Sequence, residues 1–239
     1  MPVMKQSKLE GVYTDGSRQF TMNRDPGHRV YGEDLVASGG AEYRAWDPRR
    51  SKLAAALLNG LETFPFTPAS RVLYLGAASG TTPSHVSDLA REGQVFCVEI
   101  ASRPFRDLVA LCERRRNMHP ILADAGNPEA YAPIVQSADV AYQDISQKDQ
   151  VGILDRNMEA LPPSTGTAIL MVKARSIDVS ANPAKIFARV ESQLIEQVDV
   201  KTSSAEQRRV SRFQNVQRLG NQFTVASPRD AGAAQVERN

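Results

Sequence analysis

Cysteine and long apolar runs are what this 239-residue sequence has least of. Its two cysteines, Cys97 and Cys112, fall in a predicted strand and a predicted helix, so we expect two buried thiols rather than a disulfide or a metal site. A run of about 18 apolar residues, which a membrane-spanning helix needs, is missing, and so is a charged-then-apolar leader. These absences predict a soluble cytoplasmic protein without membrane association.

The sequence also lacks a strong excess of either charge. Lysine and arginine together number 29 and aspartate and glutamate 27, and the resulting net charge of +2 does not by itself indicate a nucleic-acid-binding protein. Basic residues nevertheless gather in three clusters: Arg44, Arg49, Arg50 and Lys52; Arg114, Arg115 and Arg116; Arg208, Arg209 and Arg212. Contact with nucleic acid would therefore depend on local basic patches.

Histidine is scarce as well, with three in the chain. His28 follows a Pro-Gly dipeptide, His85 lies near the start of a predicted helix, and His119 precedes a proline. None is spaced from another histidine or cysteine as metal ligands are. We expect all three in loops or on the surface, and no metal site.

Composition predicts three parts along the chain. Residues 1–45 are polar and glycine-rich, with β-like stretches at 11–13, 19–22 and 29–30 and a hairpin signal at Asp15-Gly16, which indicates a small β-rich domain. Residues 46–227 form the predicted main domain, and Asp47-Pro48 is expected to introduce its first helix. Residues 228–239 are expected to be a disordered tail.

From residue 70 onward, predicted strands alternate with predicted helices. The strands cover 72–75, 94–100, 120–122, 140–143 and 168–172, and the helices cover 83–90, 104–116, 150–161 and 183–197. Strands connected by helices of this length form a parallel sheet with right-handed crossovers. The predicted fold class is therefore α/β with a Rossmann-like sheet, in which ligands bind at the carboxyl ends of the strands.

A run of small residues joins the first of these strands to the following helix: Gly76, Ala77, Ala78, Ser79, Gly80, Thr81 and Thr82. Small residues let the backbone turn sharply and approach a ligand, and the start of a helix offers free N–H groups. The lysine of a Walker loop and the G-x-G-x-x-G dinucleotide pattern are both absent. The loop alone indicates a nucleotide site of some kind, and a tight turn without a ligand is the alternative.

Three acidic residues lie at or just after the ends of successive predicted strands: Glu99, Asp124 and Asp144. A carboxylate at position 99 can accept hydrogen bonds from both hydroxyls of a ribose, and Asp124 could contact an adenine amino group. A single acid at a strand end is more often a helix cap or a turn former. Three of them together with a glycine-rich loop favour an adenosyl ligand.

Two lysines complete a possible catalytic set with Asp144. Lys173 follows the strand 168–172, on the same rim of the sheet as Asp144, and Lys52 lies in the first helix. If the adenosyl ligand is a methyl donor and the acceptor is a ribose hydroxyl, the transfer needs a positioned proton acceptor, because an alcohol is a poor nucleophile. A lysine near an acid can orient the hydroxyl or, with a lowered pKa, accept its proton. A surface cation is the alternative for each lysine, and taken alone Lys52 fits it better.

Together these residues resemble the archaeal fibrillarin-like RNA 2′-O-methyltransferases, from about residue 10 to about residue 195. The most specific matches are the segment 42–48, which contains Trp46, and the strand and loop 72–82. Further matches cover 30–33, 50–55, 84–88, 98–99, 115–117, 124–125, Asp144 with Gln147, 149–150, 173–175 and 177–178.

The resemblance implies a Rossmann-like methyltransferase domain behind a small N-terminal β-rich domain, with Lys52, Asp144 and Lys173 in catalysis. It implies S-adenosylmethionine as cofactor, bound by Gly76, Ala78, Thr81, Thr82, Glu99, Ile100, Asp124, Ala125, Asp144, Ile145, Ser146 and Gln147. The implied substrates are ribose 2′-hydroxyls of rRNA and tRNA, selected by a box C/D guide RNA. The implied protein partners are a Nop-family scaffold and a kink-turn-binding ribosomal protein, without a nucleolar Gly/Arg-rich extension.

One family feature is missing near the C-terminus. Similar sequences usually carry a Pro-Tyr-x-x-Asp-His-like motif there, whereas this chain has no histidine after His119. A non-catalytic or weakly active subunit of the same particle is therefore an alternative. A methyltransferase that acts on protein or on a small molecule is a third possibility.

Overall fold

The computed structural model describes residues 3–61, 64–161, 166–199, 214–219 and 222–226. The chain divides into two compact units, Met1–Asp124 and Ala125–Asn239, which are taken in turn. The predicted tail, 228–239, lies outside the described residues. Among the helices described, none is long and apolar enough to cross a membrane.

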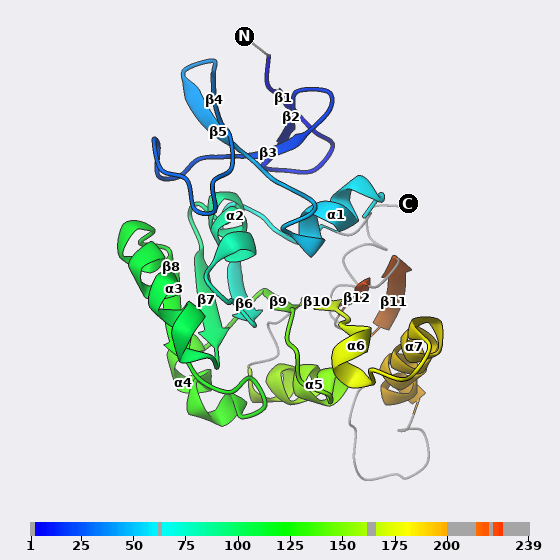
Figure 1. Cartoon of the computed structure of the whole chain (residues 1–239). Helices are drawn as coiled ribbons and strands as arrows, with labels where there is room; N and C mark the ends of the chain where they lie inside the picture. The colour runs from blue at the N-terminus through cyan, green and yellow to red at the C-terminus, as the bar shows by residue number, and fades with distance from the viewer. Residues whose placement is uncertain (1–2, 62–63, 162–165, 200–213, 220–221, 227–239) are drawn as a thin grey trace, which may run out of the picture. The chain divides into compact units, whose positions relative to one another are not determined.

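Unit 1 begins with a five-stranded antiparallel sheet in the order β1-β2-β3-β5-β4 (Figure 1, blue). Its strands are β1 (Lys5–Gln6), β2 (Val12–Thr14), β3 (Gln19–Met22), β4 (Leu35–Ser38) and β5 (Ala41–Ala45). The predicted hairpin between β2 and β3 is confirmed, and the Asp15 carboxylate accepts the N–H groups of Ser17 and Arg18 at 2.9 and 2.8 Å.

Two expectations for this region were wrong. Residues 29–30 form no strand, because the N–H groups of Val30 and Tyr31 donate to the Glu33 carboxylate instead of to a neighbouring strand. The first helix, α1 (Lys52–Leu58), begins later than Asp47-Pro48. Its N-cap is Ser51, whose hydroxyl accepts the N–H of Ala54 at 3.3 Å.

Unit 1 also contains three parallel strands in the order β6-β7-β8: β6 (Arg71–Leu75), β7 (Gln94–Glu99) and β8 (Met118–Leu122). Helix α2 (Thr81–Leu89) connects β6 to β7, and α3 (Ser102–Arg114) connects β7 to β8 and packs on both strands. Cys97 and Cys112 are both buried and unpaired, as predicted, and burial raises the pKa of the Cys112 thiol to about 12.

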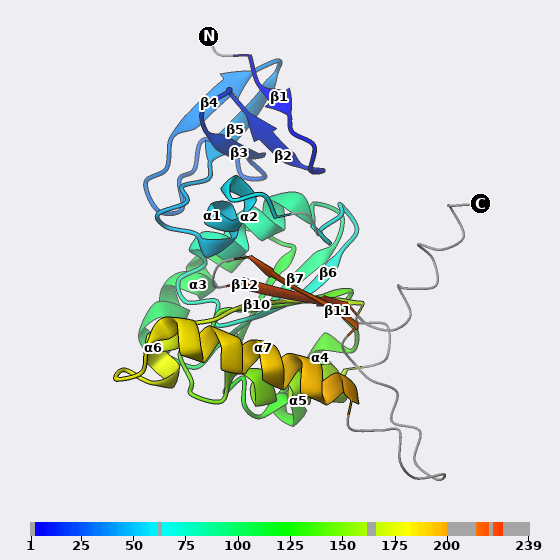
Figure 2. The same ribbon diagram turned by 90° about the vertical axis from the view of Figure 1, so that its right-hand side faces the viewer.

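In unit 2, the parallel strands β9 (Val140–Gln143) and β10 (Thr167–Met171) are extended by two antiparallel strands, β12 (Gln222–Ala226) and β11 (Gln214–Leu219) (Figure 1; Figure 2 labels β10, β11 and β12). The helices are the 3-10 turn η1 (Pro128–Ala130), α4 (Ala132–Val135), α5 (Gln150–Ala160), α6 (Ala174–Ile177) and α7 (Pro183–Asp199). The predicted helices at 150–161 and 183–197 are therefore present, with boundaries shifted by one or two residues.

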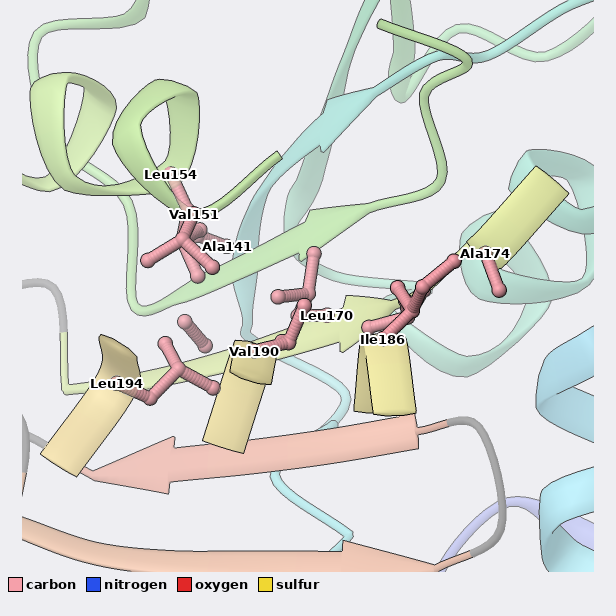
Figure 3. Close-up of a cluster of buried hydrophobic side chains, with 10 residues drawn as sticks. Ala141, Val151, Leu154, Leu170, Ala174, Ile186, Val190 and Leu194 are labelled. Atoms are coloured by element: carbon pink, nitrogen blue, oxygen red, sulfur yellow. The ribbon is translucent and has the colours of Figure 1, made fainter. Parts of the chain in front are cut away.

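The core of unit 2 contains a cluster of buried hydrophobic side chains from α7, β10 and neighbouring elements (Figure 3). Ile186, Val190 and Leu194 of α7 recur every fourth residue, so they lie on one face of the helix. They belong to one buried cluster with Leu170 and Val172, which lie at the end of β10 and just after it. Burying a side chain of this size stabilises the folded state by about 1.5–3 kcal/mol, so this cluster contributes to the stability of unit 2.

Candidate active site

The loop between β6 and α2 turns on residues with left-handed backbone conformations. Gly76 has φ 85°, Ala78 has φ 48° and Gly80, the N-cap of α2, has φ 92°. A Cβ on Gly80 would collide with the side chain of Leu111 on α3, so glycine is required there for two reasons. The loop is tied to β7, because the N–H of Gly76 donates to the carbonyl of Val98 at 2.9 Å.

Glu99, the last residue of β7, lies against this loop. One carboxylate oxygen accepts the N–H of Ala78 at 2.8 Å and the other accepts the N–H of Ala101 at 2.7 Å. Two carboxylate oxygens offer about four lone-pair sites, so each can accept another hydrogen bond. The buried carboxylate is therefore fixed in orientation and retains the capacity to accept ribose hydroxyls.

Helices α1 and α2 meet at a pair of hydroxyl groups. Thr82 donates to Ser51 Oγ at 3.1 Å, and the same oxygen caps α1. Lys52 is the first residue of α1 and therefore follows this cap directly. Thr82, predicted to bind the cofactor, thus also fixes the start of the helix that carries Lys52.

Two arginines predicted to belong to basic surface clusters are buried. Arg44 is 0% exposed and Arg115 1%, so neither is available to RNA, which corrects that interpretation. Arg44 and Arg115 lie 2.8 and 2.6 Å from the two oxygens of Asp88, and Arg44 also lies 2.7 Å from Glu33. Burial raises the pKa of Glu33, but Arg44 and backbone N–H donors outweigh it and hold that pKa below its ordinary value.

The expectation that all three histidines lie in loops or on the surface was wrong for two of them. His85 is 0% exposed within α2, with Nδ1 2.7 Å from Thr21 Oγ1 and Nε2 2.8 Å from the Tyr31 hydroxyl. Burial, with Arg44 nearby, holds the pKa of His85 well below its ordinary value, so the ring is neutral. His119 lies in β8, half-buried and stacked on Phe96, and His28 is exposed as expected.

In unit 2, Asp144 follows β9 and Lys173 lies just beyond β10, its parallel neighbour. The Lys173 ammonium nitrogen Nζ lies 3.1 Å from Asp144 Oδ1. It also donates to the Asp144 carbonyl at 3.0 Å and to Ser146 Oγ at 3.2 Å. The three donors of the ammonium thus face three oxygen acceptors, while the lysine side chain stays 28% exposed and reachable by a ligand.

The remaining predicted residues divide between the two units. Unit 1 contains Lys52, the loop 76–82, Glu99, the exposed Ile100 and the exposed Asp124. Unit 2 contains the buried Ala125 and, after Asp144, Ile145, Ser146 and Gln147. The structure brings Asp144, Ser146 and Lys173 together, and separately Ala78 and Glu99. Within the described residues, no group of three or more histidine, cysteine, aspartate or glutamate side chains is placed to hold a metal ion.

The model of the protein family Fibrillarin matches residues 3–214. The chain belongs to the fibrillarin family. A fibrillarin-like rRNA/tRNA 2′-O-methyltransferase of Methanopyrus kandleri is 52% identical over 195 residues, which cover 79% of this chain and 84% of the relative. The protein of the same name from Methanosarcina acetivorans is 51% identical over 181 residues, covering 74% and 79%. The resemblance identified from the sequence is confirmed.

Solved structures agree. Methanococcus jannaschii fibrillarin, a pre-rRNA processing protein, matches with a TM-score of 0.81 and 35% identity, covering 95% of this chain and 99% of that one. Aeropyrum pernix fibrillarin with natively bound S-adenosyl-L-methionine matches at 0.77 and 37%, covering 93% and 97%. A fibrillarin in complex with Nop5p matches at 0.77 and 33%, covering 93% and 99%. The Rossmann-like methyltransferase fold with a small N-terminal β-rich part is therefore confirmed.

Proposed function

We propose that this chain transfers the methyl group of S-adenosylmethionine to ribose 2′-hydroxyls of rRNA and tRNA. The observation that carries the proposal is the Lys173–Asp144 pair, 3.1 Å apart at the ends of two parallel neighbouring strands, in a chain of the fibrillarin family. The names of the relatives and the cofactor bound to the Aeropyrum fibrillarin support the same reaction.

The residues of unit 1 fit an adenosyl cofactor. The loop turns at Gly76 without a side chain, so a ligand can approach its backbone there. Glu99 offers a fixed, buried carboxylate for ribose hydroxyls, and the exposed Ile100 next to it offers an apolar surface to a base. Free N–H groups at the start of α2 favour an anionic group such as an amino-acid carboxylate. When bound, the cofactor supplies a methyl group on a positively charged sulfur.

The residues of unit 2 fit the handling of the hydroxyl. The Lys173 ammonium holds both the side chain and the carbonyl of Asp144, so the carboxylate is presented in one orientation. The ribose hydroxyl would donate its hydrogen bond to Asp144 and would release its proton there when it accepts the methyl group from the cofactor. Lys52, which the family resemblance adds to the catalytic set, belongs to unit 1. Much of the rate comes from positioning, because the sulfonium is already a reactive methyl donor.

Guide RNA and partner proteins would supply target selection. A box C/D guide RNA would choose the nucleotide by base pairing, with a Nop-family scaffold and a kink-turn-binding ribosomal protein completing the particle. The crystal structure of a fibrillarin with Nop5p supports a scaffold of this kind. The burial of Arg44 and Arg115 leaves the enzyme fewer exposed cations of its own, which favours RNA held largely by partners.

Reconstitution with a guide RNA and the partner proteins tests the proposal. We expect a 2′-O-methyl group at the nucleotide that the guide specifies, and none with a mismatched guide. Methyl transfer that needs no guide would contradict it and favour a protein or small-molecule substrate. Binding of S-adenosylmethionine by calorimetry without methyl transfer would favour the assembly-subunit alternative, which the absence of a histidine after His119 keeps open.

A further inference from the structure

A buried glutamine forms hydrogen bonds with both backbone polar groups of Lys173. Gln150, the first residue of α5, is 1% exposed. Its Oε1 accepts the N–H of Lys173 at 3.0 Å, and its Nε2 donates to the carbonyl of Lys173 at 3.3 Å. Lys173 lies beyond the last paired residue of β10 next to β9, so this amide takes the place that a neighbouring strand would occupy.

The same glutamine is linked back to the acid. The Gln143 side chain donates from Nε2 to the Gln150 carbonyl at 2.6 Å, and Gln143 immediately precedes Asp144. The links therefore close a ring: Asp144 to the Lys173 ammonium, the Lys173 backbone to Gln150, and Gln150 to Gln143. A ring of this kind restricts the backbone rotations that would move Nζ of Lys173 away from the Asp144 carboxylate.

We propose that Gln150 is a positioning residue that holds Lys173 in the orientation in which its ammonium meets Asp144. The inference rests on the proposed function, since it assigns Gln150 to the same methyl-transfer step. Gln150 touches neither reacting atom, so it acts through Lys173. Misplacement of a reacting group by about 1 Å can lower a rate about a hundredfold, which sets the scale of the expected effect.

Gln150→Met is the sharpest variant, because methionine keeps the length and volume of the side chain while removing both hydrogen bonds. In a reconstituted particle, we expect the single-turnover rate of methyl transfer to fall about ten- to a hundredfold. We expect the dissociation constant for S-adenosylmethionine to stay within about threefold of the wild-type value, as for a loss of positioning rather than of binding. Leu194→Ala, in the same buried cluster of unit 2, is the control for lost stability and should keep nearly the full rate.

Gln150→Glu supplies a second, conservative test that does not depend on the first variant folding. A protonated carboxyl can accept the Lys173 N–H and donate to the Lys173 carbonyl, whereas a carboxylate can only accept. The rate of this variant, divided by the wild-type rate at the same pH, should therefore rise as the pH is lowered from about 8 to about 6, because burial raises a carboxyl pKa.

Three results would overturn the inference. They are a Gln150→Met rate within about threefold of wild type, an equal rate loss in Leu194→Ala of matched melting temperature, and weakening of cofactor binding by as much as the rate falls. If Gln150→Met does not fold, a pH-independent rate ratio for Gln150→Glu overturns it instead. An unaltered rate in Lys173→Ala would show, separately, that the proposed catalytic role of Lys173 is wrong.

Discussion

Replacing Asp88 by asparagine tests how much the buried ionic cluster of unit 1 contributes to stability. The cluster consists of Asp88, Arg44, Arg115 and Glu33. The expected loss in the free energy of unfolding follows from the contacts of Asp88. The Asp88 side chain is 0% exposed and accepts four hydrogen bonds. The donors are Arg44 at 2.8 Å, the Thr21 hydroxyl at 2.8 Å, Arg115 at 2.6 Å and the N–H of Arg24 at 3.0 Å. Asparagine has the same shape but turns one acceptor into a donor, so donors would face donors.

The charge effect adds to the lost hydrogen bonds. Arg44 would keep Glu33 as a partner, whereas Arg115 would lose the carboxylate 2.6 Å away and remain buried. Removing one partner of a buried ion pair costs about 3–5 kcal/mol, because the other charge stays uncompensated. For a chain of this length, that loss lowers the melting temperature by roughly 6–20 °C.

Urea unfolding followed by circular dichroism and by the fluorescence of the single tryptophan, Trp46, measures this loss. Trp46 stacks on His85 within unit 1, with 4.9 Å between ring centroids, so it reports on the cluster directly. Asp34→Asn is the matched control, because Asp34 pairs with Arg18 at 2.9 Å but is 70% exposed and should lose less than about 1 kcal/mol. Equal losses in the two variants would refute the reasoning.

Three further predictions concern unit 1. His85 titrates well below its ordinary pKa of about 6.5 when folded, so the unfolded chain binds the proton first and stability falls as the pH drops below about 6.5. His85 contributes up to about 1.4 kcal/mol per pH unit to the slope of the free energy of unfolding against pH, measured by urea unfolding. This contribution should vanish in His85→Gln and persist in His28→Gln. Gly80→Ala should lower the free energy of unfolding by about 1–3 kcal/mol, measured in the same way, because φ is 92° and the methyl group collides with Leu111; an unchanged stability would contradict the tight turn. Glu99→Gln should weaken S-adenosylmethionine binding about tenfold by calorimetry, since only one of its two acceptors survives, and an unchanged affinity would remove Glu99 from the cofactor site.

The alternating strands and helices could be predicted because the sequence pattern that marks each of them is local. Strands β3 and β9 have the predicted boundaries, and α2, α3, α5 and α7 start within two residues of their predicted positions. The short helices η1, α4 and α6 were not predicted. Asp144 and Lys173 could be placed together for the same reason, because neighbouring parallel strands end on one edge. The β4–β5 hairpin was missed although its signal was present, since Gly39 and Gly40, with φ 59° and 82°, form the turn.

The buried polar cluster could not be predicted from local pattern. Thr21 bonds His85 across 64 residues and Arg115 bonds Asn23 across 92, and nothing near any of these residues in the sequence indicates its partner. His85 and Arg115 were therefore assigned the surface role that is usual for such side chains when they have no buried partner. The role of Gln150 could not be predicted for a related reason. Its side chain binds the backbone groups of Lys173, which lies 23 positions away in the sequence.

The most direct test of the account is single-turnover methyl transfer by Lys173→Ala in the reconstituted particle, with cofactor binding measured in parallel. Lys185→Ala is the matched control, because Lys185 is exposed on α7. The account predicts that Lys173→Ala loses at least about a hundredfold in rate, keeps its affinity for S-adenosylmethionine, and differs in rate from a fully active Lys185→Ala. A Lys173→Ala enzyme that methylates the guided nucleotide at the wild-type rate would contradict it.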